Sequence, residues 1–292
     1  MRGRGGGVGG DPRVRLRRRL PSVVPVSDIP EFRADGVRVL VTGATSGLGA
    51  AMAAALVDAG ARVAVTGRDP GRAHRVAETL GTAAVGVGMD VRDEDDVARG
   101  VAEAGDRLGG LDVLVNNAGI GMRTVNPRFL TDPQPFWQVT PDGFRDLVAT
   151  NLTGYFLVAR AVVPRLLETG GRVVNVSMNH ATMNRRGFVP YGPARAGAEA
   201  LSRIMAADLA GSGVTVNILL PGGATATGMI PVDFPAGHRD LLLDPAVMAA
   251  PIRFLCSTGA ADVHDERIVA TEFAGWLAAR IEHDLSGSSS PI

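Results

Sequence analysis

Short hydrophobic runs alternate with longer alanine- and leucine-rich stretches along most of this chain. The β-branched runs predict buried strands at Val37–Val41, Arg62–Thr66, Ala84–Met89, Val113–Asn116, Arg172–Val176, Val214–Leu219 and Arg267–Ala270. The stretches between them predict helices at Leu48–Ala59, Pro70–Thr79, Glu94–Gly105, Pro141–Thr169, Tyr191–Ala210 and Pro245–Leu255. Strands that alternate with helices are typical of a doubly wound, mostly parallel sheet with helices on both faces. The pattern therefore predicts an α/β fold with about seven strands in a single domain, residues 35–283.

Two segments that contain prolines, 120–138 and 222–243, interrupt this alternation directly after a predicted strand. In an open parallel sheet the carboxyl ends of the strands face the ligand, so we expect both segments to form substrate loops or lids. Outside the domain we expect a basic, disordered leader over residues 1–34 and a flexible tail over residues 284–292.

The charge of the chain is unevenly distributed. Thirty basic residues balance thirty acidic ones, and all thirty basic residues are arginine, so the chain has no lysine. Residues 1–20 hold seven arginines and one acid, Asp11, which leaves the rest of the chain mildly acidic. An acidic domain argues against a nucleic-acid partner and favours a small-molecule substrate.

Composition excludes several further classes of protein. The single cysteine, Cys256, cannot form an internal disulfide, so we expect a reducing, cytoplasmic location. The apolar runs are interrupted before they reach the roughly 20 residues that a membrane-spanning helix needs, so we expect no membrane span. The histidines are far apart and predict no metal site; they are His74, His180, His238, His264 and His283.

A glycine-rich turn joins the first predicted strand to an alanine-rich helix. Its three glycines permit a tight turn, and the N-terminus of the helix offers free N–H groups to a pyrophosphate. The turn therefore predicts a dinucleotide site, and the residues that we expect to contact the phosphates are Gly43, Thr45, Ser46, Gly47, Leu48 and Gly49.

The end of the second strand bears on which dinucleotide is bound. NAD is usually held by an acid about 20 positions past the turn, but the strand here ends in Gly67 and Arg68. The planar guanidinium of Arg68 can hold a 2′-phosphate, which favours NADP(H) over NAD(H). In the alternative, Arg68 is an ordinary surface arginine and Asp69 binds the ribose.

Several motifs in this order resemble the short-chain dehydrogenase/reductase family, a Rossmann-fold family, over roughly residues 37–270. They are the spacing of the glycine turn, Asn116-Asn117-Ala118-Gly119 after the fourth strand, and Pro221-Gly222 followed by Thr225 and Thr227. The resemblance implies a nicotinamide-dependent oxidoreductase that forms a homodimer or homotetramer. It adds further expected cofactor contacts, namely Asp90, Val91, Asn117, Ala118, Gly119, Pro221, Gly222 and Thr225.

The same resemblance implies a catalytic tetrad of Asn, Ser, Tyr and Lys. Asn151, Ser177 and Tyr191 match it, but Arg195 occupies the position of the lysine. Tyr191 follows Ser177 by fourteen residues, one more than is usual, and the usual position holds Met178. Either the loop has gained a residue or the role of the serine is displaced. Tyr191 and Arg195 lie four residues apart on one helix face, and both are also expected to contact the cofactor.

The arginine changes what the tetrad can do. In the family the tyrosine gives or takes the substrate proton while hydride passes between nicotinamide and carbon. A unit charge about 4 Å from the phenol, at an effective dielectric of ~20, is worth roughly 4 kcal/mol, so Arg195 could stabilise the ionised phenol. A guanidinium does not release its proton in proteins, so Arg195 could not readily relay one.

Three functions follow from these residues. The first is an NADP(H)-dependent oxidoreductase that interconverts a ketone and a secondary alcohol on a small, largely apolar metabolite. The alternative is a non-redox enzyme of secondary metabolism, such as a dehydratase, isomerase or cyclase, that uses the same pocket. The third is a nucleotide-sensing or interaction protein without catalysis.

Residues near the expected substrate offer further candidates. Met178, Asn179 and His180 follow the fifth strand, and Met229 lies in the second interrupting segment. His180 could act as an acid or base near neutral pH, or it could simply be solvated. Arg185 and Arg186 could contact an anionic substrate or contribute only surface charge.

Overall fold

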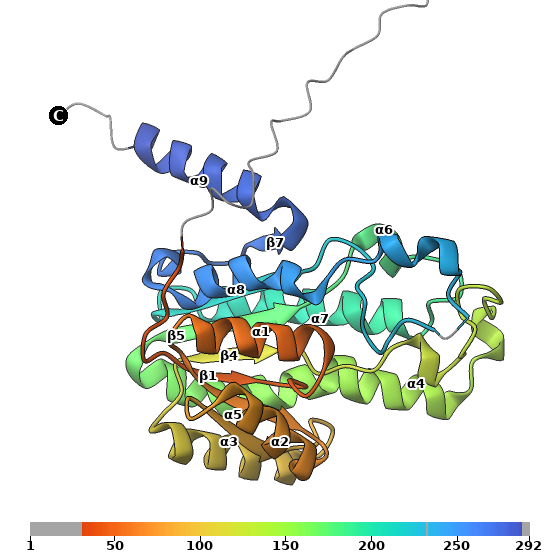
Figure 1. Cartoon of the computed structure of the whole chain (residues 1–292), viewed down its shortest axis with the longest axis horizontal. Helices are drawn as coiled ribbons and strands as arrows, with labels where there is room; N and C mark the ends of the chain where they lie inside the picture. The colour runs from red at the N-terminus through yellow and green to blue at the C-terminus, as the bar shows by residue number, and fades with distance from the viewer. Residues whose placement is uncertain (1–30, 232, 288–292) are drawn as a thin grey trace, which may run out of the picture.

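A parallel sheet of seven strands forms the centre of the computed structural model, which describes residues 31–231 and 233–287 (Figure 1). The strands are β1 (Arg38–Val41), β2 (Arg62–Gly67), β3 (Ala84–Gly88), β4 (Val113–Asn116), β5 (Gly171–Val176), β6 (Val214–Leu220) and β7 (Arg267–Val269). Their order is β3-β2-β1-β4-β5-β6-β7, and every neighbouring pair is parallel. The predicted doubly wound α/β fold is confirmed.

The helices largely follow the predicted stretches. They are α1 (Gly47–Asp58), α2 (Pro70–Leu80), α3 (Glu94–Leu108), α4 (Pro141–Val148), α5 (Gly154–Thr169), α6 (His180–Met183), α7 (Tyr191–Asp208), α8 (Ala249–Cys256) and α9 (Phe273–Gly287). The predicted helix over 141–169 is α4 and α5 joined by a π-helical segment, Ala149–Thr153. The predicted helix over 245–255 is a 3₁₀ turn followed by α8.

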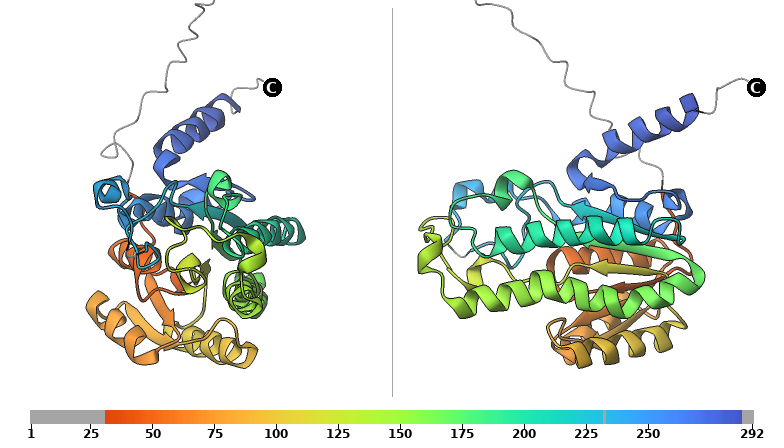
Figure 2. Two further views of the ribbon diagram at one scale, coloured as in Figure 1. Left: turned by 90° about the vertical axis from the view of Figure 1, so that its right-hand side faces the viewer. Right: turned by 180° about the vertical axis from the view of Figure 1, so that it is seen from behind.

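Alternation along the strands directs side chains to two cores. Val39 and Val41 of β1 pack on one face with α1 and α8, whereas Leu40 packs on the other with α3 and α5. Successive strand residues point to opposite faces, and a parallel sheet is covered on both. Figures 1 and 2 show this sandwich, with α1 and α8 on one side of the sheet and α5 and α7 on the other.

The joined helices Pro141–Thr169 are long and apolar enough to cross a membrane by length and composition alone. In this fold the side of α5 that carries Val158, Val162 and Leu166 is buried against the sheet and α3. Packing of this kind is what a core helix of an α/β domain requires, and it accounts for the apolar composition of the run.

A chain of buried amides ties the carboxyl end of the sheet to α7. Asn116 of β4 donates from Nδ2 to Oδ1 of Asn175 on β5, at 3.0 Å. Asn175 in turn donates to the hydroxyl of Ser202 on α7, at 2.8 Å. Buried amides are stable only when they are paired, so this chain fixes where α7 lies on the sheet.

Both ends of the described chain contain more ordered structure than the sequence analysis predicts. Phe32, in the expected disordered leader, packs edge-on against Phe254 of α8 and Phe273 of α9, so part of that leader belongs to the fold. Residues 1–30 lie outside the described residues. The helix α9 was not predicted; it projects from the body in every view and extends to residue 287, within the expected tail (Figure 2).

Candidate active site

A cleft of about 920 Å³ lies along the carboxyl ends of the strands. Every residue that the sequence assigns to the cofactor lines it: Gly43, Thr45, Ser46, Gly47, Leu48, Gly49, Arg68, Asp90, Val91, Asn117, Ala118, Gly119, Tyr191, Arg195, Pro221, Gly222 and Thr225. Ser177, Met178, Asn179 and Met229 line it as well. Asn151 and His180 do not. The fold thus brings residues from six strand ends into one cavity.

The N-terminus of α1 is built to receive an anion. Ser46 precedes the helix, but its side chain makes no capping hydrogen bond, and the first turn contains no acid. The side chains of Asp69, Asp93 and Thr140, by contrast, cap α2, α3 and α4. No side chain therefore accepts from the first N–H groups of α1, which remain free to donate to an anion. The positive end of the helix dipole faces the cleft.

The turn before α1 is locked to the turn after β4. Asn117 donates from Nδ2 to the carbonyls of Thr42 and Gly43, and the Thr42 hydroxyl accepts from the backbone of Asn117 and Ala118. Gly43 has φ +63°, and a Cβ there would lie 2.7 Å from Cα of Ala118. Only glycine fits this close approach, so the backbone cradle that a pyrophosphate needs is fixed in advance.

Two arginines lie at the β2 end of the cleft. Arg68 and Arg72 both line it, and Arg72 donates to the carbonyl of Thr45 at 3.3 Å. Asp69, the alternative ribose ligand, accepts from the backbone N–H of Arg72 and so serves as the cap of α2. The sequence analysis did not predict that Arg72 lines the cleft. Its spacing of four residues from Arg68 could have indicated that the two side chains lie on one side.

Asp90 also lines the cleft, but its charge is compensated. The guanidinium of Arg92 donates to both carboxylate oxygens of Asp90. These hydrogen bonds hold the pKa of Asp90 below its usual range. Asp90 therefore adds little net negative charge to this end of the cleft.

Arg195 is buried between the only two tyrosines of the chain. Its guanidinium carbon lies 5.4 Å from the ring centre of Tyr155 and 5.4 Å from that of Tyr191. Its Nη1 donates to the Tyr155 hydroxyl at 2.6 Å and to the carbonyl of Val176 at 2.9 Å. The hydroxyl of Tyr155 donates to the same carbonyl at 3.0 Å. The arginine is thus held by cation–π contacts and a closed set of hydrogen bonds.

This burial has an electrostatic consequence. Desolvation opposes the charge of Arg195, but the neighbouring tyrosine hydroxyls favour it, and the pKa of Arg195 stays above its ordinary value. Desolvation raises the pKa of Tyr155, so its hydroxyl stays protonated. A Cβ at position 119 would lie 2.6 Å from Nη2 of Arg195, so Gly119 is needed to make room for the guanidinium.

Asn151 lies outside the cleft and acts on the backbone beside it. Its Nδ2 donates to the carbonyl of Ile120, and its Oδ1 accepts from the N–H of Ile120, both at 2.9 Å. The residue sits in the π-helical segment that links α4 to α5. It therefore fastens the start of the first substrate loop to that helix.

Ser177 is engaged by a side chain that the sequence did not flag. Its hydroxyl donates to Oε1 of Glu199 on α7, at 2.5 Å. Arg267 donates from Nε to both oxygens of Glu199 and from Nη2 to the carbonyl of Met178. Burial alone would raise the pKa of Glu199, but the hydrogen bonds from Ser177 and His180 and the charge of Arg267 lower it. The single hydroxyl proton of Ser177 is therefore committed to a carboxylate.

The position of His180 corrects the expectation of a substrate contact. Its Nε2 lies 2.8 Å from Oε2 of Glu199, and its side chain is 62% exposed. His180 does not line the cleft, and its ring is engaged by this carboxylate. Glu199 lies eight residues after Tyr191, two helical turns along the same helix, which is the signal that could have found it.

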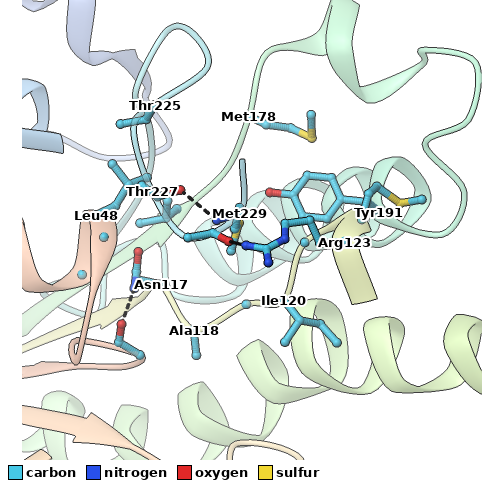
Figure 3. Close-up of a pocket in the computed structure, with 18 of the residues that line it drawn as sticks. Leu48, Asn117, Ala118, Ile120, Arg123, Met178, Tyr191, Thr225, Thr227 and Met229 are labelled. Carbon is cyan, nitrogen blue, oxygen red and sulfur yellow. Dashed lines mark hydrogen bonds between the residues drawn. The ribbon is translucent and has the colours of Figure 1, made fainter. Parts of the chain in front are cut away.

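Figure 3 shows the remaining cavity walls. Leu48, Thr225 and Thr227 lie at the cofactor side, and the Tyr191 hydroxyl points toward the centre of the cavity. Arg123, which the sequence did not flag, also extends into the cavity. Among residues 31–231 and 233–287, no group of three or more His, Cys, Asp or Glu side chains could hold a metal ion.

Comparisons with known proteins agree with this geometry. The sequence profile of the short chain dehydrogenase family matches residues 37–234. A 3-oxoacyl-(acyl-carrier-protein) reductase of Vibrio harveyi is 32% identical over 246 residues, which cover 80% of this chain and 95% of that protein. A D-threitol dehydrogenase of Mycolicibacterium smegmatis is 33% identical over 251 residues, which cover 82% of this chain and 93% of that protein.

Solved structures of reductases and dehydrogenases share this fold. A 3-ketoacyl-(acyl-carrier-protein) reductase from Brucella melitensis, complexed with NADH, superposes with a TM-score of 0.72 and 30% identity, over 81% of this chain and 97% of that one. A dehydrogenase/reductase from Sinorhizobium meliloti 1021 superposes with a TM-score of 0.71 and 29% identity, over 83% and 96% of the two chains.

The arrangement around Arg195 predicts unequal effects at its two tyrosines. Tyr155→Phe leaves a buried guanidinium N–H and the Val176 carbonyl each short of a partner, so we expect the free energy of unfolding to fall by about 1–3 kcal/mol. Tyr191→Phe keeps its ring over Arg195 and removes a hydroxyl that faces the cleft, so we expect a loss below about 1 kcal/mol. Urea unfolding of both variants measures this, and equal losses would contradict the assigned role of Tyr155.

Proposed function

This chain belongs to the short-chain dehydrogenase/reductase family, and from that premise we propose that it is a cytoplasmic, NADP(H)-dependent oxidoreductase. In this proposal it interconverts a ketone and a secondary alcohol on a small, largely apolar metabolite. The observation that carries the proposal is the Tyr191 hydroxyl, which opens into the same cleft as the uncapped N-terminus of α1 and has a buried guanidinium behind its ring.

The residues of the cleft fit a nicotinamide dinucleotide. The N-terminus of α1 and the cradle at Gly43 suit the pyrophosphate, and Arg68 with Arg72 suits a 2′-phosphate. Gly119 and the segment 221–225 would lie beside the nicotinamide. When bound, the nicotinamide supplies hydride to the carbonyl carbon or takes it from the alcohol.

Tyr191 handles the proton in this proposal. During reduction its hydroxyl donates a proton to the carbonyl oxygen, and during oxidation the ionised phenol accepts the proton of the alcohol. Arg195 stays charged throughout, so it stabilises the ionised form by its field and does not relay a proton. The proton is replaced from solvent, because Tyr191 is only partly buried.

Asn151 and Ser177 take indirect roles in this scheme. Asn151 positions the substrate loop through both bonds to Ile120. Ser177 donates its hydroxyl hydrogen bond to Glu199, so we assign the hydrogen bond to the substrate carbonyl to Tyr191. Met178 and Met229 supply apolar wall beside it.

Two departures from the family's tetrad, Arg195 in place of the lysine and the hydrogen bond of Ser177 to Glu199, favour a second candidate function. An arginine that cannot relay a proton and a serine that cannot donate one suit a non-redox enzyme, such as a dehydratase, isomerase or cyclase. Turnover of substrate without consumption of NADPH would select this candidate.

We also propose that the protein is a homodimer or homotetramer that pairs through α5 and α7. Phe156 and Leu167 of α5 and Ile204 of α7 are 46%, 49% and 58% exposed. The two helices lie side by side on one outer face (Figure 2, right). Exposed apolar groups on one face indicate a self-complementary interface.

Sedimentation velocity tests this assembly. At micromolar concentration we expect the natural chain to sediment as a dimer or tetramer and the double variant Phe156→Arg, Ile204→Arg to sediment as a monomer. Leu241→Arg, at a position 73% exposed and away from α5 and α7, should leave the assembly intact. A monomeric natural chain would refute the proposal.

Arg68 tests the preference for NADP(H). Arg68→Ala removes a charged hydrogen-bond donor to the 2′-phosphate, so we expect a loss of roughly 10- to 100-fold in NADPH affinity and little change for NADH. Calorimetry with both nucleotides measures the ratio. Arg75→Ala is the matched control, because Arg75 lies on α2 but does not line the cleft. Equal losses for both nucleotides would disprove the assigned contact.

Tyr191 tests the reaction itself. Tyr191→Phe removes the proposed acid–base group at the reacting end of the cleft, so we expect carbonyl reduction to fall by about 10²–10⁴-fold. NADPH affinity should stay within about 3-fold, which separates lost chemistry from lost binding. The assay follows NADPH consumption with a broad panel of ketones. A variant that keeps more than about a tenth of the natural rate would refute this role of Tyr191.

A further inference from the structure

Arg123 is a charged side chain in the substrate half of the cleft. It lies in a 3₁₀ turn, Met122–Thr124, just after the Asn-Ala-Gly turn that follows β4, and it is half-buried. Its Nη1 donates to the carbonyl of Gly228, in the second substrate loop. Within the described residues its Nε and Nη2 make no hydrogen bond, and it forms no ion pair. The Nε and Nη2 side of the planar guanidinium is therefore free to donate two parallel hydrogen bonds.

A second arginine lines the same half of the cleft. Arg185 follows α6, and its guanidinium carbon lies 5.6 Å from the ring centre of Phe188. It too has no ion-pair partner in the part of the chain that the structure describes. Arg186, the next residue, is exposed and does not line the cleft.

The cleft contains no acid that could neutralise these two arginines. Asp90 is the sole acidic residue among the described residues that line it; it lies at the cofactor end and is paired with Arg92. The walls around Arg123 and Arg185 are otherwise largely apolar, with Ile120, Met122, Phe129, Leu130, Phe188 and Met229. Arg185 is exposed and Arg123 is half-buried, so it is the Arg123 guanidinium whose charge an anion would stabilise in this apolar wall.

We propose that Arg123, assisted by Arg185, binds a carboxylate of the substrate. The substrate class is then an oxo acid, or the matching hydroxy acid, whose apolar body fills the cavity and whose carbonyl meets Tyr191. The free Nε and Nη2 of Arg123 match the two oxygens of a planar carboxylate. This inference rests on the proposed function and specifies its substrate.

Binding of the carboxylate also involves the loop that closes the cavity. Arg123 already contacts the backbone of Gly228, so an anion on its other edge lies between the first substrate loop and the second. Arg123→Gln removes the charge and keeps an amide that can donate to the Gly228 carbonyl. It therefore tests anion binding with the loop contact preserved.

The experiment compares unbranched oxoalkanoates, which differ in the distance between ketone and carboxylate, with their methyl esters. We expect the natural enzyme with NADPH to prefer the best acid over its ester by about 10-fold or more in kcat/KM. Arg123→Gln should lower kcat/KM for the acid by roughly 10- to 100-fold, mainly through KM, and change it for the ester by less than about 3-fold. Arg186→Gln, the matched control, should change neither.

Two outcomes overturn the inference. One is an equal loss for acid and ester in Arg123→Gln, which would make Arg123 a loop contact only. The other is a natural enzyme that does not discriminate between acid and ester.

Calorimetry separates this inference from the proposed function. If no ketone is reduced, the same acids and esters are titrated into the protein with NADP⁺ bound. Binding of the acid but not the ester, lost in Arg123→Gln, supports the carboxylate site although the redox function has failed. If none of the acids binds, the proposed carboxylate site is overturned.

Discussion

The burial of Arg195 between Tyr155 and Tyr191 is the constraint on which the site depends. Hydrogen bonds stabilise a buried guanidinium, and here the Tyr155 hydroxyl and the Val176 carbonyl accept from Nη1 of Arg195. Nε of Arg195 is buried without a partner in the described part of the chain. An unpaired buried donor costs stability, so the placement of Arg195 is not explained by stability alone. Gly119 leaves room for Nη2, and the ring centre of Tyr191 lies 5.4 Å from the guanidinium carbon. The part of the cleft at Gly119 and the side chain of Tyr191 are thereby organised around one fixed cation.

A second network, around Glu199, decides what the rest of the tetrad can do. Glu199 lies one helical turn after Arg195 and accepts from Ser177, His180 and Arg267. The carboxylate accepts the hydrogen bond of the serine hydroxyl and engages the histidine ring outside the cleft. In the proposed function, one acid on α7 therefore engages two acid–base candidates and leaves the proton transfer to Tyr191. The two networks share α7, whose position is set by the buried amides between β4, β5 and Ser202.

Local chemistry explains which features could be predicted from the sequence. The strands, the phosphate turn and its glycines follow from periodicity and from backbone conformations that only glycine adopts readily, so the predicted fold and the lining of the cleft agree with the structure. The helix α9 was missed because the start of that helix is anchored by aromatic packing with Phe32 and Phe254, which are distant in sequence. The orientation of His180 and Ser177 depends on Glu199, and the exposure of Arg123 to the cavity depends on how two loops meet. Such contacts are tertiary, and no pattern within one segment contains them.

The absence of lysine gives the site a further property. Arginines supply every basic side chain that lines the described cleft: Arg68, Arg72, Arg123, Arg185 and Arg195. A guanidinium does not give up its proton in proteins, and Arg92 holds the pKa of Asp90 below its usual range. A lysine at the site could titrate when buried; an arginine cannot. In the proposed function, the charges of these arginines therefore stay fixed during the reaction, and Tyr191 gives or takes the substrate proton.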